Sequence, residues 1–136
     1  MGRRSETPTA QGWHRARSLA ESFRFAWNGL RTALRSQRNL RIDMAVGLGA
    51  AVLAWVLRLP LGQVALVILA AVSVIGAELL NSALESLVDM VQFREDPVAR
   101  RVKDMAAAAV LVTAVGAFLV GLALFLPPLV RLLSGS

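Results

Sequence analysis

Hydrophobic and polar positions are spaced in two different ways along this chain. Between about residues 17 and 40, apolar side chains recur every three or four positions: Leu19, Phe23, Ala26, Leu30 and Leu34. Arginines occupy the opposite side of that repeat. Later in the chain, uncharged stretches cover residues 44–57, 59–77 and 105–130. The first pattern is typical of an amphipathic helix and the second of helices that cross a membrane, so the sequence predicts an all-α integral membrane protein.

These patterns give the expected elements. They are a loose tail over residues 1–16 and one membrane-embedded domain over 17–136, with an amphipathic helix at 17–40 and spans at 42–59, 61–90 and 97–126. Arginines opposite an aromatic-rich stripe predict that the first helix lies in the membrane interface; packing on its own protein is the alternative. Asp96 and Pro97 suit the N-cap and first position of the last helix, which Pro127 and Pro128 are expected to end or kink.

Composition supports the membrane assignment and excludes some chemistry. The 136 residues are 56% hydrophobic, with a mean hydropathy of +0.58, which is too apolar for an ordinary soluble domain. The chain has no cysteine, so disulfides, thiol catalysis and Cys-based metal sites are excluded. The single histidine, His14, falls in the tail and is assigned no role.

The basic residues predict an orientation and a kind of partner. Nine of the fifteen precede residue 42, four follow the second span, and the first hairpin and the C-terminus hold one each. The positive-inside rule then places the N-terminus and the 91–103 loop in the cytoplasm and the C-terminus outside the cell membrane. Next to apolar spans, a basic segment favours an anionic lipid surface over nucleic acid.

Polar residues interrupt the second span on one side. Glu78, Asn81, Glu85 and Asp89 fall within roughly 80° of one another on a helix. A carboxylate at membrane depth is costly and marks a functional site, although Asp89 is equally compatible with a cap or an ion pair near the membrane boundary. Two acids one to two turns apart suit a general base and a ligand for a hard divalent cation.

The only lysine of the chain lies at the same cytoplasmic level. Lys103, followed by Asp104, falls about two turns into the last helix, and lysine suits phosphate oxygens as a compact charge. Acids, a cation and one lysine at an interface indicate phosphoryl transfer, but no Walker loop or kinase glycine-rich loop is present. Spacing alone leaves a kinase and another metal-dependent membrane enzyme open. Three short helices also enclose a polar site poorly, which predicts an oligomer.

Two stretches carry a family resemblance. "AELLNSALESLVD" followed by "VKDMAAAAVLV" resembles the prokaryotic diacylglycerol kinase / undecaprenol kinase family over about residues 18 to 126. The resemblance implies a small homotrimeric membrane kinase that uses MgATP to phosphorylate a lipid alcohol. It also implies composite active sites, shared between subunits at the cytoplasmic face.

The resemblance further implies a role for each matching residue. Glu78 matches the catalytic base, Asn81 the amide beside it, and Glu85 the carboxylate that holds Mg²⁺ beside the nucleotide. Lys103 and Asp104 match the nucleotide-binding pair. Arg31 and Arg41 match positions that hold lipid and phosphate, and Asp89 is expected to support the site.

One position departs from the family pattern. Gln37 stands where a second metal-binding glutamate is expected, and it offers a carbonyl oxygen without charge. The resulting expectation is a lipid kinase, with undecaprenol favoured as substrate and diacylglycerol as the close alternative. Because of Gln37, a catalytically weak membrane scaffold is the alternative from another class.

Overall fold

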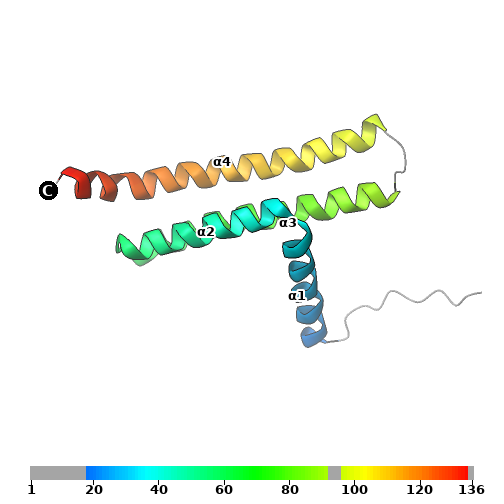
Figure 1. The fold of residues 1–136 in the computed structure, drawn as a ribbon, viewed down its shortest axis with the longest axis horizontal. Coiled ribbons are helices and arrows are strands. Elements are labelled where there is room, and N and C mark those ends of the chain that lie inside the picture. The colour runs from blue at the N-terminus through cyan, green and yellow to red at the C-terminus, as the bar shows by residue number, and fades with distance from the viewer. Residues whose placement is uncertain (1–17, 92–95, 135–136) are drawn as a thin grey trace, which may run out of the picture.

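The computed structural model describes residues 18–91 and 96–134, and the regular structure of these residues is entirely helical. Helix α1 comprises Leu19–Ser36, α2 Arg38–Val56, α3 Leu61–Val91 and α4 Pro97–Ser134. Helices α2, α3 and α4 run alongside one another, whereas α1 projects crosswise from the start of α2 (Figure 1). By length and composition, α2, α3 and α4 can each cross a membrane. The predicted all-α architecture with three spans is therefore confirmed, while the predicted tail with His14 lies outside the described residues.

The expected helix over 17–40 is in fact divided at Gln37. This residue has extended backbone angles (φ −100°, ψ 117°) and separates α1 from α2, although its N–H still bonds to the carbonyl of Ala33 at 2.7 Å. Arg41 reaches back from α2, and its Nη1 donates to the carbonyl oxygens of Leu34 (3.3 Å) and Arg35 (3.2 Å). These carbonyls have no partner within their own helix, so the arginine stabilises the end of α1. One extended residue is enough to turn α1 away from the spans.

The last helix also differs from expectation, because it does not end at about residue 126. Helix α4 continues through Pro127 and Pro128 to Ser134. Proline has a φ that suits a helix, and membrane helices tolerate the two missing N–H groups because neighbouring groups re-satisfy the freed carbonyls. As Figure 1 shows, the C-terminal part of α4 extends beyond the end of α2.

Hydrogen bonds cap the start of α4 and the end of α2. Asp96 Oδ1 accepts hydrogen bonds from the backbone N–H groups of Val98 (2.6 Å) and Ala99 (3.1 Å), so the predicted N-cap of α4 is confirmed. Between α2 and α3, Arg58 adopts a left-handed conformation with φ 52°, and the N–H of Leu59 bonds to the carbonyl of Ala54 at 3.0 Å. This is the usual hydrogen-bond pattern by which a helix ends before a tight turn.

Helix α3 lies between α2 and α4 and contacts both. The buried apolar residues among those described are few: Leu40, Ala54, Val67 and Ala106. Large apolar side chains elsewhere, such as Trp55 and Leu133, are strongly exposed. A surface of this kind needs lipid chains or other protein helices around it, because water would not tolerate so large an apolar area.

Candidate active site

One face of α3 changes from apolar to polar along its length. In order, the residues of this face are Val67, Ala71, Val74, Glu78, Asn81, Ser82 and Glu85. They recur at three- and four-residue spacing, which brings them to the same side of a helix. The apolar half of the face lines a cavity between α2 and α4, and the polar half follows it toward the end of the helix. The predicted polar stripe is therefore the continuation of an apolar surface.

The polar half of this face is among the least accessible parts of the molecule. Glu78 is 4% exposed, Asn81 8% and Ser82 7%, although most residues of α3 are partly or fully exposed. Burial of an ionisable group costs free energy unless hydrogen bonds or opposite charges compensate it. Small proteins seldom keep such a group without a functional reason, so Glu78 marks the centre of the candidate site.

The neighbours of Glu78 come from α2 as well as α3. The side chain of Asn39, in the first turn of α2, makes a hydrogen-bonding interaction with the Glu78 carboxylate. Asp43, one turn further along α2, and Glu85 both lie close enough to repel it electrostatically. Two further carboxylates thus surround that of Glu78, and the Asn39 amide compensates only part of its negative charge.

Asn81 and Glu85 form the second part of the cluster. Asn81 Nδ2 donates to Glu85 Oε1 at 3.1 Å, whereas the buried Asn81 Oδ1 has no hydrogen-bond partner within the described part of the chain. No group of three or more His, Cys, Asp or Glu side chains gathers into a ready metal site within residues 18–91 and 96–134. The oxygen donors that remain, a carboxylate and a neutral amide oxygen, suit a hard cation that takes its other ligands from a substrate or water.

Helix α4 contributes Lys103, the predicted phosphate ligand. Its Nζ forms an ion pair with Asp89 Oδ1, which ties the start of α4 to the end of α3. Both side chains are partly exposed, so the lysine is accessible to an anionic ligand. Asp104 is exposed on α4, and because adjacent helical residues point about 100° apart, it does not share the direction of Lys103.

The remaining predicted residues lie near α1. Arg41 hydrogen-bonds to the carbonyl groups at the end of α1, as described above, and Arg31 is exposed on α1. Gln37 lies at the junction of α1 and α2, two residues before Asn39. Their predicted roles in binding lipid, phosphate and metal stay predictions.

Sequence reasoning missed three residues of the cluster as site members. Ser82 is one helical turn from Glu78 on the same face, so the periodicity that identified the stripe also predicts its position. Asn39 and Asp43 belong to a different helix, and only the packing of α2 on α3 brings them to Glu78. No local pattern in the sequence indicates that contact.

Comparison with known proteins identifies the family. Residues 24–125 match the family model described as prokaryotic diacylglycerol kinase. The chain is 42% identical over 122 residues to a diacylglycerol kinase of Synechocystis sp., an alignment that covers 89% of this chain and 70% of the relative. It is 32% identical over 109 residues to an undecaprenol kinase of Bacillus subtilis, covering 80% of this chain and 89% of that protein.

These identities do not support the expected preference for undecaprenol, because the relative named for diacylglycerol shares more of this sequence. The family match spans α2, α3 and most of α1 and α4, and thus contains the whole candidate site. The chain belongs to the prokaryotic diacylglycerol kinase family and is a membrane-protein lipid kinase, a phosphotransferase that acts on an alcohol.

Proposed function

We propose that this protein transfers the γ-phosphate of ATP to the hydroxyl group of a lipid alcohol, with Glu78 as the general base. The observation that carries the proposal is the position of Glu78 on α3. Its buried carboxylate lies where an apolar cavity ends and a polar cluster begins. A lipid alcohol has the same division, an apolar tail and a polar end, so its hydroxyl meets the carboxylate when the tail lies along the apolar face.

In the proposed reaction, the Glu78 carboxylate accepts the proton of the lipid hydroxyl. The lipid oxygen then forms a bond to the γ-phosphorus of ATP, the bond between that phosphorus and the β–γ bridging oxygen breaks, and ADP leaves. Proton acceptance by a positioned base contributes on the order of 10²–10⁴-fold to such a rate. Asn39, by hydrogen-bonding to the carboxylate, keeps it oriented toward the acceptor.

Lys103 is the proposed ligand of the ATP phosphates, with Asp104 as a second nucleotide contact. The ion pair with Asp89 holds the lysine against α3. Since Asp89 is the more exposed partner, phosphate oxygens are able to replace it without burying an unpaired charge. Asp89 lies one helical turn from Glu85 on α3, so the lysine that it binds is on the side of the helix that carries the proposed metal ligand.

Mg²⁺ is the proposed metal, held by Glu85 and by the unpartnered Oδ1 of Asn81, with the phosphates and water as further ligands. Mg²⁺ commonly binds in this way, through one or two carboxylates and substrate oxygens. When bound, it neutralises charge on the transferring phosphoryl group. Gln37 is a neutral candidate for a further ligand at the α1–α2 junction.

The proposed setting is a homotrimer in the cell membrane with its active sites at the cytoplasmic face. The basic residues before α2 and around the start of α4 favour a cytoplasmic N-terminus and an outer C-terminus. Helix α1 combines exposed apolar residues such as Leu19 and Phe23 with several arginines, and it projects crosswise from the spans, which suits a helix lying in the membrane interface (Figure 1). The exposed apolar faces of the spans provide surface for subunit contacts.

The test is transfer of labelled phosphate by the purified protein in lipid micelles, with diacylglycerol and undecaprenol offered side by side. The expected result is labelled lipid with at least one of them and ADP formed in equal amount. If neither lipid is labelled while the protein is folded and assembled, the scaffold function suggested by Gln37 is favoured instead.

A further inference from the structure

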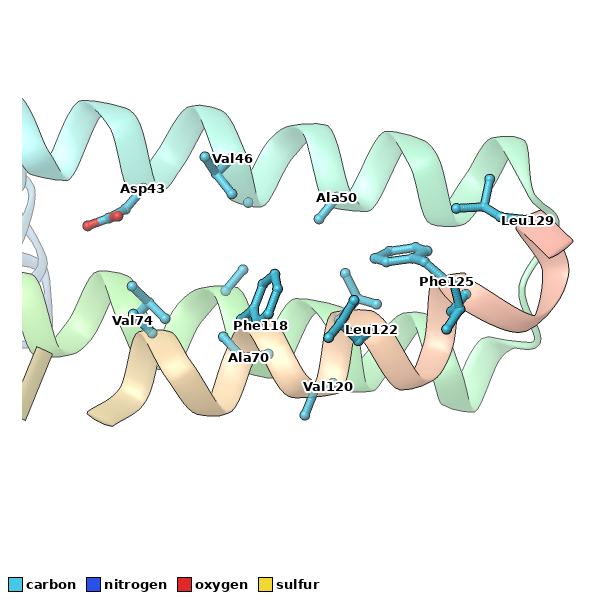
Figure 2. Close-up of a pocket in the computed structure, with 17 residues that line it drawn as sticks. Asp43, Val46, Ala50, Ala70, Val74, Phe118, Val120, Leu122, Phe125 and Leu129 are labelled. Carbon is cyan, nitrogen blue, oxygen red and sulfur yellow. The ribbon is translucent and has the colours of Figure 1, made fainter. Parts of the chain in front are cut away.

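A second pocket lies at the end of the bundle that is remote from the candidate site. Figure 2 shows Asp43 at one end of the apolar cavity and Leu129 at the other, and the second pocket begins at the chain neighbour of Leu129. This distal pocket has a volume of about 540 Å³, within the range of ligand pockets. Its described lining comes from the end of α2, the turn that follows and the last turns of α4: Val56, Leu57, Arg58, Pro128, Arg131 and Leu132.

Both basic residues of this end line the distal pocket. Arg58 is the only basic residue between positions 42 and 91, and Arg131 is the only one after Lys103. They belong to different elements, yet they line one pocket. Pro128, Arg131 and Leu132 are spaced by three and four residues, so they share a face of α4. The continuation of α4 through its prolines is therefore what brings Arg131 to the pocket.

The two guanidinium groups have no counter-charge from the described part of the chain. Among these residues, no side-chain hydrogen bond or ion pair engages either of them. On α2 the nearest carboxylate is Asp43, about 20 Å before the end of the helix, and on α3 it is Glu78, about 25 Å after the start. On α4, Asp104 precedes Arg131 by about 40 Å. Two like charges beside one apolar surface repel each other, and an anion bound between them removes that repulsion.

The backbone at Arg58 is a second, independent indication. Its φ of 52° lies in the left-handed region, which favours glycine or asparagine and which a long side chain seldom adopts. Backbone hydrogen bonds close the turn: the N–H of Arg58 bonds to the carbonyl of Trp55, and that of Leu59 to the carbonyl of Ala54, each at 3.0 Å. These bonds do not involve the guanidinium group, so the turn does not account for an arginine at this position.

The rest of the lining fits a lipid better than a free ion. Val56, Leu57, Pro128 and Leu132 are apolar. Val56 is 60% and Leu132 68% exposed, so the pocket opens onto the apolar surface of the bundle. A ligand there has an anionic group at the arginines and an apolar part over these side chains. Arginine binds phosphate oxygens through parallel N–H donors, and a phospholipid with a net negative headgroup supplies both parts.

We propose that the distal pocket binds an anionic phospholipid, with its phosphate group between Arg58 and Arg131 and an acyl chain along Val56 and Leu132. The bound lipid connects the turn after α2 to the last turns of α4, which share no hydrogen bond or ion pair among the described residues. It thereby stabilises the end of the bundle opposite the proposed active site. The site goes beyond the proposed kinase function and does not depend on it.

The experiment measures lipid preference at Trp55, which lies in the last turn of α2 and is 78% exposed. Replacing Trp13 and Trp27 by phenylalanine in the full-length protein leaves Trp55 as the single tryptophan. This protein is reconstituted into phosphatidylcholine vesicles that contain increasing fractions of phosphatidylglycerol with brominated acyl chains, which quench nearby tryptophan. Brominated phosphatidylcholine is the reference, and the two quenching curves give a relative binding constant.

The size of the expected preference follows from the two charges. A basic residue near an anionic lipid surface contributes about 1 kcal/mol, a factor of about five. The single-tryptophan protein should therefore prefer phosphatidylglycerol about 25-fold, Arg58→Asn and Arg131→Gln about fivefold each, and the double variant should show no preference. Asparagine is used at position 58 because it tolerates the left-handed conformation. Arg58→Lys combined with Arg131→Lys should keep most of the preference, because both charges remain.

Matched controls lie at the other end of α4. Arg100→Gln and Arg101→Gln remove the same charge from exposed positions near the start of that helix, and they should keep the preference of the single-tryptophan protein. Circular dichroism and size-exclusion chromatography verify that each variant retains its helices and its assembly.

Three results would overturn the inference. Equal quenching by the two lipids in the single-tryptophan protein would show that the arginines select no headgroup. A preference that persists in the double variant would show that it arises elsewhere. Loss of the preference when inorganic phosphate replaces chloride at equal ionic strength would show that the free anion, and not the lipid, is the ligand. None of these measurements involves phosphate transfer, so the proposed kinase function stands or falls separately.

Discussion

Replacing Glu78 by glutamine should lower activity and raise stability at the same time. Glutamine has nearly the same shape and retains an oxygen for Asn39, but it cannot accept a proton. Loss of a general base lowers the rate by about 10²–10⁴-fold, equivalent to about 2.7–5.4 kcal/mol in the activation barrier. The same change removes a charge that is 4% exposed and repelled by Asp43 and Glu85. We expect the free energy of unfolding to rise by about 1–3 kcal/mol, the usual cost of burying an incompletely compensated polar group.

Two measurements are needed on the same preparation. Activity is the initial rate of labelled phosphate transfer from ATP to diacylglycerol in micelles. Stability is obtained from unfolding in increasing fractions of sodium dodecyl sulfate, with the fluorescence of the three tryptophans as the signal. The expected variant transfers almost no phosphate and unfolds at a higher detergent fraction than the wild type.

A loss of activity combined with a gain in stability distinguishes a catalytic role of Glu78 from a structural one. Asp89→Asn serves as the control, because it also neutralises a carboxylate of α3 but at an exposed position. If Glu78→Gln loses stability together with activity, Glu78 holds the helices together and the assignment of the base is wrong. Retained activity in this variant would contradict the assignment directly.

Three further predictions concern the nucleotide, the metal and the assembly. Lys103→Ala should raise the KM for ATP about tenfold or more. Asp89→Asn should change the free energy of unfolding by less than about 1 kcal/mol, because the Lys103–Asp89 pair is partly exposed. If both variants lose activity equally, Asp89 takes part in the reaction itself. Gln37→Glu should lower the Mg²⁺ concentration for half-maximal rate several-fold, and an unchanged Mg²⁺ dependence would show that the metal binds elsewhere. Mixing Glu78→Gln chains with Lys103→Ala chains should restore part of the activity in mixed trimers, and failure in demonstrably mixed assemblies would favour sites contained within one subunit.

The sequence predicted the helices and the polar stripe because both depend on local periodicity. Three apolar stretches are enough to predict three spans, and the spacing of Glu78, Asn81 and Glu85 predicts a common face. The sequence predicted the boundary between the amphipathic helix and the first span at about residue 41, a few residues after the observed break at Gln37, because glutamine is a good helix former and the carbonyl contacts of Arg41 leave no local pattern. Of the two outcomes expected at Pro127 and Pro128, an end or a kink, the end is wrong, because α4 continues to Ser134. Proline ends helices more reliably in water than in a membrane, where neighbouring groups compensate for the lost hydrogen bonds.

The parts of the site that the sequence did not reveal depend on contacts between helices. Asn39 and Asp43 become neighbours of Glu78 only when α2 packs on α3. The cavity needs all three spans, and its lining is ordinary alanine, valine and phenylalanine that no motif distinguishes from the rest of a membrane helix. For this reason the family resemblance indicated the reaction, whereas the cavity beside Glu78 could be found only from the arrangement of the helices in space.

The burial of Glu78 has a consequence for how ATP is used. A carboxylate that accepts a proton from a lipid hydroxyl is equally able to accept one from water, and transfer of the phosphoryl group to water would hydrolyse ATP without product. At 4% exposure the carboxylate has little contact with solvent, and the adjoining cavity is lined by apolar side chains apart from Asp43, so it holds water poorly. Exclusion of water from a site prevents such side reactions. The surroundings of the base thus favour a lipid hydroxyl over water as the acceptor, and ATP turnover is expected to depend on a lipid whose hydroxyl lies beside the carboxylate.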